Sequence, residues 1–142
     1  MRKRLPKFQY IEHTADVGIQ VFALSRKELF EHAAEGMFDI IADLDSVTAK
    51  SEQKVNVEAS DCEALLVSWL SELNFLYLTE EILFKEFQIV RLNDNELSAV
   101  VRGEPVDFDK HKIHTEIKAV TYHHLYIKEK EGIWKTQIIF DL

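Results

Sequence analysis

The stretch SRKELFEHAAEGMFDII, residues 25–41, contains the clearest secondary-structure signal in the chain. Ser25 is followed three residues later by Glu28, which is the capping-box pattern of a helix N-terminus. Apolar residues then recur at helical spacing, at Leu29, Phe30, Ala33, Ala34, Met37, Phe38 and Ile41. This stretch therefore predicts an amphipathic helix of about four turns that buries one face.

A second helix is predicted from the same two signals further along the chain. Ser60 and Glu63 repeat the capping-box pattern. Apolar residues again follow at helical spacing, at Leu65, Leu66, Trp69, Leu70, Leu73 and Tyr77. We expect the two helices to supply the centre of the core, with the residues Phe30, Phe38, Leu66, Leu70 and Leu73.

Strand patterns surround both predicted helices. Apolar residues alternate with period two over residues 17–23 and 55–59, and residues 8–11 also read as a strand. From residue 82 onward the segments FQIVRL, LSAVV, EIKAVTYHHLYIK and WKTQIIF follow one another, with turns at 93–95 and 131–132. This order predicts an α+β fold, a two-layer sandwich in which two amphipathic helices pack on a mainly antiparallel sheet.

The composition indicates one globular domain, residues 1–142, with residues 1–7 as a flexible basic leader. Hydrophobic residues make up 46% and charged residues 30% of the chain, which excludes a disordered protein. No apolar run approaches the roughly 20 residues of a membrane span, and the leader lacks the apolar segment of a signal peptide. The single cysteine, Cys62, fits a reducing compartment. We therefore expect a cytoplasmic protein without a membrane partner.

The net charge of −8 disfavours direct binding to the phosphate backbone of a nucleic acid. An acidic surface suits a basic protein partner or bound cations, and it also serves solubility. The sequence contains no GxxxxGKS/T, GxGxxG or HExxH motif, so nucleotide hydrolysis is unsupported. We interpret Cys62 as a packed small residue, His32 as a solvated helix residue, and His111 and His114 as parts of a polar connection without a zinc site.

The polar sequence EHTAD, residues 12–16, interrupts an otherwise apolar strand pattern. Its Asp16 could be joined by Asp141 and by the terminal carboxylate of Leu142 if the first and last strands are neighbours. Such a group of oxygen atoms would suit Ca²⁺ or Mg²⁺, although single acids at strand ends are also ordinary. His13 could act as a general base or bond to the backbone, and His123 should point to the face opposite its neighbour His124.

Two separated segments resemble the signatures of the archease family and together span nearly the whole chain. YIEHTADVGIQVFALSRKELFEHAAEGMFDII, residues 10–41, resembles its amino-terminal signature, in which a His-Thr-Ala-Asp sequence precedes a capped helix. EIKAVTYHHLYI followed by WKTQIIFDL resembles its carboxy-terminal signature, including the closing Phe-Asp-aliphatic sequence. One departure is Glu12, which stands where many members carry Asp.

The resemblance implies an accessory protein and not an enzyme. The family is known as an activator of the GTP-dependent RNA ligase that joins a 3′-phosphate or 2′,3′-cyclic phosphate end to a 5′-hydroxyl, as in tRNA splicing. The resemblance therefore implies that the protein promotes guanylylation of the ligase and multiple turnover by the ligase. The alternatives are a metal-dependent hydrolase that uses His13, His123 and Asp16, and a chaperone-like binding module.

The resemblance also implies a set of metal ligands. The ligands of the family correspond to Asp16 of the HTAD sequence and to Asp141 and Leu142 of the FDL sequence. His13, Thr14 and His123 are then supporting residues that position the ligands. Ligands that bind only through oxygen favour a hard divalent ion, and we predict Ca²⁺, with Mg²⁺ as the alternative.

Overall fold

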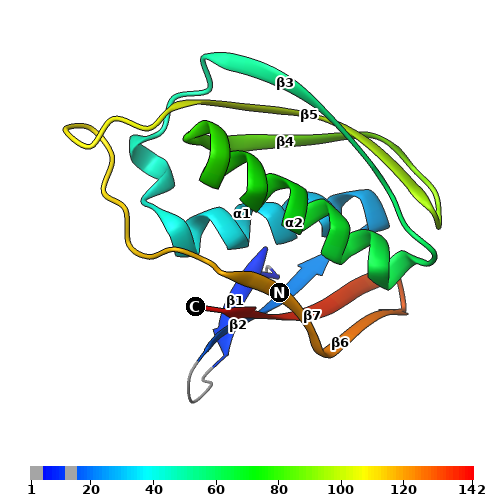
Figure 1. Cartoon of the computed structure of the whole chain (residues 1–142). Helices are drawn as coiled ribbons and strands as arrows, with labels where there is room; N and C mark the ends of the chain where they lie inside the picture. Colours follow the sequence, from blue (N-terminus) through cyan, green and yellow to red (C-terminus); the bar gives the residue numbers. More distant parts are fainter. Residues whose placement is uncertain (1–4, 12–15) are drawn as a thin grey trace.

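Two helices lie between two antiparallel sheets in the computed structural model, which describes residues 5–11 and 16–142 (Figure 1). The four-stranded sheet contains, in spatial order, β1 (Phe8–Ile11), β2 (Asp16–Ala23), β7 (Ile133–Asp141) and β6 (Ala119–Lys130). The three-stranded sheet contains β3 (Ser51–Glu58), β5 (Glu96–Pro105) and β4 (Ile82–Leu92). The helices are α1 (Arg26–Ile41), α2 (Cys62–Glu80) and the short 3₁₀ helix η1 (Leu44–Ser46).

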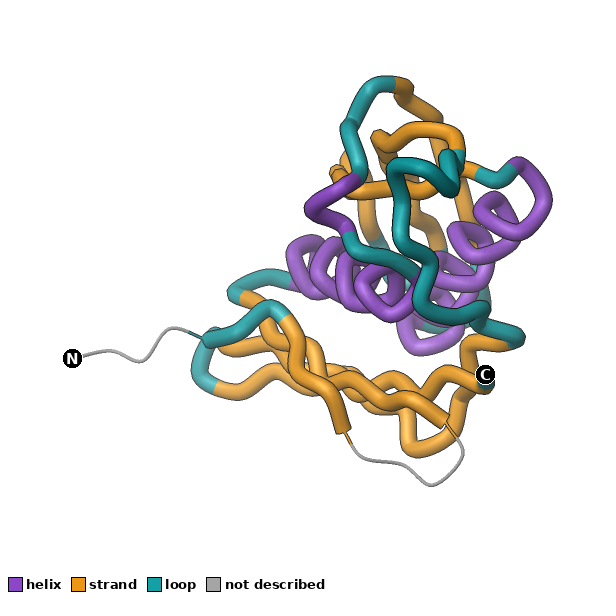
Figure 2. The backbone as a smooth tube through the Cα atoms, turned by 90° about the vertical axis from the view of Figure 1, so that its left-hand side faces the viewer, coloured by secondary structure: helices purple, strands orange, loops and turns teal. Residues whose placement is uncertain are grey.

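The predicted α+β class, with two helices packed on antiparallel strands, is confirmed. The strands form two sheets and not the single sheet that we expected, so the helices occupy a middle layer (Figure 2). Both α1 and α2 contact strands of both sheets. The sequence of α2 fits this position, because its buried residues occur around much of the helix: Leu65, Leu66, Val67, Trp69, Leu70, Leu73, Asn74 and Leu76.

The helix starts show one correct and one wrong prediction. Ser25 caps α1 as predicted, and its side chain accepts a hydrogen bond from the backbone N–H of Glu28 at 3.1 Å. The cap of α2 is Asp61 and not Ser60, because the Asp61 carboxylate accepts the backbone N–H of Ala64 at 2.8 Å. The helix therefore begins one residue later than the capping-box pattern indicated.

One hydrophobic core connects both sheets to the helices. The five residues predicted for its centre are fully buried: Phe30, Phe38, Leu66, Leu70 and Leu73. Phe38 of α1 packs edge-on against Phe84 of β4, with the ring centroids 5.8 Å apart. The core residues Ile19 and Phe140 come from the opposite sheet, so α1 is covered on both sides by buried apolar side chains.

The chain is already fixed at the last residue of the predicted basic leader. Lys7 accepts the backbone N–H of Phe22 at 3.0 Å through its carbonyl, and its ammonium group lies 3.0 Å from Glu35 of α1.

In the described part of the chain, no helix is long and apolar enough to cross a membrane.

Candidate metal-binding site

Strands β2 and β7 come from opposite ends of the sequence and are neighbours in the four-stranded sheet, which brings two predicted ligands together. In the antiparallel pair of β2 and β7, Asp16 lies directly opposite Asp141. The next pair, Val17 and Phe140, packs into the core, so the two carboxylates lie on the outer face, away from the helices. Asp16 is half-buried and Asp141 is exposed.

The outer face beside the two acids is closely packed. Gly18 lies opposite Ile139, and a Cβ atom at Gly18 would lie only 2.8 Å from the Cδ1 atom of Ile139. The glycine therefore lets the Ile139 side chain cover β2, and Ile139 is only 2% exposed. This packing holds the two strands in the register that pairs the acids.

The pair of carboxylates favours a bound cation for an electrostatic reason. Like charges directly opposite each other on antiparallel strands destabilise the sheet, and a divalent cation between them reverses the sign of that interaction. Leu142 follows Asp141, and its side chain packs against the core, so the end of the chain lies beside the pair. Among the described residues, no group of three or more His, Cys, Asp or Glu side chains could hold a metal ion. Among the described residues, Leu142 is the neighbour of the pair that was predicted as a further donor.

The supporting residues were only partly placed. His13 and Thr14, like Glu12, lie outside the described residues. His123 is exposed and lies in β6 where the register shifts between Thr121 and Tyr126. The prediction that His123 and His124 point to opposite faces is wrong, because their ring centroids lie 4.0 Å apart. His124 has a φ angle of 54°, and this left-handed conformation interrupts the alternation of the strand.

Comparison with known proteins identifies the family. The model of the Archease protein family (MTH1598/TM1083) matches residues 8–142. The chain belongs to the archease family. It is 38% identical over 138 residues to "Protein archease" of Methanopyrus kandleri, which covers 95% of this chain and 99% of the relative. It is also 38% identical over 140 residues to "Protein archease" of Methanosarcina mazei, with 96% of each chain covered. These archeases are named as proteins and not by an enzymatic activity.

Two solved structures share the fold of this archease family member. The solution structure of protein 1598 of Methanobacterium thermoautotrophicum has a TM-score of 0.83 and 34% identity, and the match covers 96% of this chain and 99% of that one. The crystal structure of a Thermotoga maritima protein, described as an archease and possible chaperone, has a TM-score of 0.67 and 25% identity. That match covers 100% of this chain and 99% of the other.

A buried polar cluster at the far end of the three-stranded sheet was missed by the sequence analysis. The Glu104 carboxylate, on β5, accepts hydrogen bonds from the Lys110 ammonium at 2.8 Å, from the Thr48 backbone N–H at 2.5 Å, and from His111 Nε2 at 3.0 Å. These donors, the Lys110 bond first, lower the pKa of Glu104 to about 2. His111 Nδ1 accepts a hydrogen bond from the backbone N–H of Asp107, so the ring carries its hydrogen on Nε2 and donates it to Glu104.

This cluster has a structural function, since it attaches the segment after β5 to the chain before β3. His111 was predicted to lie in a polar connection, but it is only 3% exposed. The only sequence signal was a charged residue at a strand end between Gly103 and Pro105, which is too common to single out. His32 also differs from its prediction as a solvated residue: its side chain is 14% exposed, and its Nδ1 lies 2.7 Å from the Phe22 carbonyl.

Cys62 is a packed thiol at the start of α2, as predicted. Burial raises the pKa of the Cys62 thiol above its ordinary value, and the nearby Arg26 guanidinium, 3.8 Å from the sulfur, only partly opposes this effect. A raised pKa keeps the sulfur protonated near neutral pH, and a protonated thiol is a poor nucleophile.

Proposed function

We propose that this archease is an accessory activator of a GTP-dependent RNA ligase that joins 3′-phosphate or 2′,3′-cyclic phosphate ends to 5′-hydroxyl ends in tRNA splicing or RNA repair. Membership of the archease family supports the proposal. The observation that carries the metal-dependent part is the register of β2 and β7, which puts Asp16 directly opposite Asp141. The protein itself catalyses no step in this proposal.

Asp16, Asp141 and Leu142 would hold the divalent cation. Their donors are all oxygen atoms, which suits a hard ion, and Ca²⁺ accepts an irregular set of ligands more readily than Mg²⁺ does. When bound, the cation supplies positive charge that can attract a carboxylate of the ligase or a phosphate group. The chain contributes rigidity, because the pair Val17 and Phe140, adjacent to the two acids, is anchored in the core.

Activation requires that the protein bind one state of the ligase more tightly than the other. A protein that stabilises the ligase conformation competent for guanylylation raises the population of that state, and equal affinity for both states would have no effect. The net charge of −8 opposes RNA binding by this chain alone. We therefore expect weak RNA affinity and a salt-sensitive association with the ligase.

The test measures guanylylation and multiple turnover of the cognate ligase with and without the purified protein. The wild type should raise both, Asp16→Ala and Asp141→Ala should raise neither, and all three proteins should be folded. Glu96→Gln, which removes an exposed acid from the other sheet, is the control. Full activation by both alanine variants would refute the metal-dependent part, and no effect of the wild type would refute ligase activation.

A chaperone-like function is the second candidate, because the similar Thermotoga maritima protein is described as a possible chaperone. A chaperone should suppress the aggregation of unrelated unfolded proteins at stoichiometric concentration, without a ligase present. The hydrolase alternative predicts phosphoester hydrolysis by the purified chain alone, lost in His13→Ala. Each of these two assays omits the ligase, so their outcomes are separate from the activation test.

A further inference from the structure

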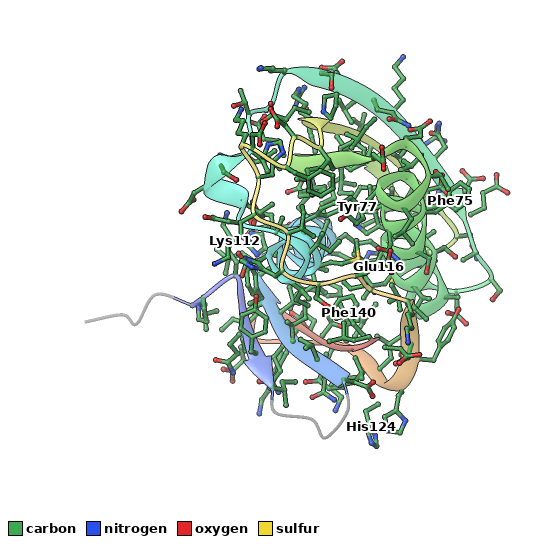
Figure 3. The ribbon with its side chains drawn as sticks, turned by 60° about the vertical axis from the view of Figure 1, so that its left-hand side comes forward. Phe75, Tyr77, Lys112, Glu116, His124 and Phe140 are labelled. Carbon is green, nitrogen blue, oxygen red and sulfur yellow. The ribbon has the colours of Figure 1, made fainter. Side chains whose placement is uncertain are left out.

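The four-stranded sheet has an outer face, opposite to the face that packs on the helices. Both helices lie on one side of this sheet, and no helix of the described chain covers the other side (Figure 2). In Figure 3, Phe140 of β7 lies between the sheet and the helices, whereas the exposed His124 of β6 projects from the opposite side. The outer face is therefore open to solvent, and the strand registers show which side chains form it.

Two adjacent rows of side chains cross the outer face at the end away from the two acids. One row consists of Phe22, Lys135 and Lys128, and the next consists of Gln20, Gln137 and Tyr126. Val21, Ile138 and Ile127 alternate with these residues along β2, β7 and β6, and they pack in or against the core. Because side chains alternate between the two faces of a sheet, both rows point outward.

Lys128 and Lys135 are a pair of like charges in direct register on β6 and β7. Such a pair destabilises a sheet, and an anion placed between the two ammonium groups relieves their repulsion. In the part of the chain that the structure describes, neither ammonium group forms an ion pair with a carboxylate. Lys130 follows on the same face, whereas Glu129 lies opposite Trp134, which packs against the core. This end of the outer face therefore favours an anionic ligand.

Both lysines of the pair lie over aromatic rings of the same face. Lys128 Nζ is 4.6 Å from the ring centroid of Tyr126, and Lys135 Nζ is 5.6 Å from the ring centroid of Phe22. An exposed cation–π contact of this kind is weaker than the stacking of a nucleic-acid base on the same ring. A base can thus take the place of the ammonium group, which then pairs with the adjacent phosphate.

The combination of side chains distinguishes a nucleic-acid strand from other anions. Phosphates match the lysines, and flat bases match the two rings. The amides of Gln20 and Gln137 both donate and accept hydrogen bonds, as the edges of bases do. Gln9 of β1 extends this row, since its Nε2 donates to Gln20 Oε1 at 2.8 Å. An acidic peptide would match the lysines only.

A bulge in β6 limits this surface on the side of the proposed cation site. The register of β6 shifts between Thr121 and Tyr126, and Gln137 Nε2 donates to the His124 carbonyl at 3.5 Å, so the bulge adjoins the row of glutamines. The surface is thus short and offers three lysines to phosphates. Because the net charge of −8 acts against them, the affinity should be low, as expected above for RNA.

We propose that the outer face of the four-stranded sheet binds single-stranded RNA. Bases stack on Phe22 and Tyr126, and phosphates pair with Lys128 and Lys135. The surface itself does not depend on the proposed function or on a cation beside Asp141, but the choice of RNA over DNA rests on the proposed function.

The experiment is a titration of ¹⁵N-labelled protein with the RNA octamer of uridine at low salt in chelator, followed by amide chemical shifts. The shifts should move around the two rows, and log K should fall with log salt with a slope of about −2, since three phosphate contacts contribute about −0.7 each on a single strand. Lys135→Gln should weaken binding at least threefold and reduce the slope to about −1.4. Phe22→Leu should weaken binding at least threefold at an unchanged slope. Lys54→Gln, an exposed lysine on the outer face of the other sheet, is the matched control.

Different ligands separate the possible occupants. Polyphosphate of equal charge should bind at least threefold more weakly than the octamer, and equal binding would refute stacking. Equal binding of polyglutamate would assign the surface to an acidic protein, and equal binding of uridine monophosphate would assign it to a free nucleotide. Tighter binding of the matching DNA octamer would refute the choice of RNA.

The variants test the position of the surface. Shifts outside the two rows, or an equal effect of Lys135→Gln and Lys54→Gln, would refute this site. The titration contains neither ligase nor free metal ions, so its failure is distinct from a failure of ligase activation or of the cation site.

Discussion

Replacing Asp141 by asparagine should change the stability of the protein in opposite directions with and without a divalent cation. Asp16 and Asp141 lie directly opposite each other, where side chains on antiparallel strands have Cβ atoms about 5 Å apart. Two unit charges at about that separation repel by roughly 1 kcal/mol in water, and less at physiological salt. In chelator, Asp141→Asn should therefore raise the free energy of unfolding by about 0.5–1 kcal/mol, which corresponds to roughly 2–4 °C in the melting temperature.

With calcium the order should reverse. A cation bound only by the folded state stabilises it by about 2.7 kcal/mol at a concentration of 100 times the dissociation constant. The wild type should show this gain, whereas Asp141→Asn should lose most of it. The backbone carbonyl of Asp141, which accepts the N–H of Lys118 at 2.8 Å, is unaffected by the substitution.

The assay is urea denaturation of both proteins in chelator and in millimolar CaCl₂. The chain supplies a matched control, because Glu58 and Glu96 are a second acidic pair in direct register, on β3 and β5. Glu96→Gln should relieve a similar repulsion in chelator and should keep the full gain from calcium. If Asp141→Asn is less stable than the wild type in chelator, or gains as much from calcium, the two carboxylates do not share a cation.

Three further predictions concern the fold. The pKa of Glu104 is lowered from 4.5 to about 2, so its contribution to the free energy of unfolding is present above pH 4.5 and is lost as the pH falls toward 2. Glu104→Gln should therefore reduce the loss of stability between pH 4.5 and pH 2, measured by urea denaturation at several pH values. Leu70→Ala, at a fully buried position of α2, should cost about 2–5 kcal/mol in the same assay at neutral pH, and a near-neutral effect would contradict its place in the core. Gly103→Ala should cost about 3 kcal/mol or more, because the new Cβ would lie 1.8 Å from the Leu83 carbonyl oxygen, and an unchanged midpoint would show that the strands are further apart.

Local signals in the sequence predicted the helices, the strands and the fold class. The cap at Ser25 and the apolar spacing of α1 act within a few residues of each other, so one sequence suffices to recognise them. The division of the strands into two sheets could not be predicted in this way, because it depends on pairings between distant segments, such as β2 with β7. The sequence of α2 gave one indication of two sheets, because its apolar residues occur around much of the helix, whereas a helix covered on one side only would show a clearer polar face.

The same distinction explains the candidate site. The pairing of Asp16 with Asp141 was predicted only on the condition that the first and last strands are neighbours, and the register of β2 and β7 supplies that condition. The Glu104 cluster was not predicted, because its donors come from two segments, at Thr48 and at Lys110 and His111, whose contact no local pattern encodes. The positions of His123 and His124 were predicted from regular alternation, which fails where the register of β6 shifts.

The distance in sequence between the two acids has a consequence for how a cation would bind. Asp16 and Asp141 come from opposite ends of the chain, so an unfolded chain holds them apart and offers the ion no paired site. Binding free energy at this site is therefore folding free energy, and it acts on the pairing of β2 with β7. Because Val17 and Phe140, the next pair along these strands, pack into the core, movement of the carboxylates is resisted by buried side chains. A group of a partner that contacts a cation bound here would therefore meet a charge whose position is fixed by the packing of β2 and β7.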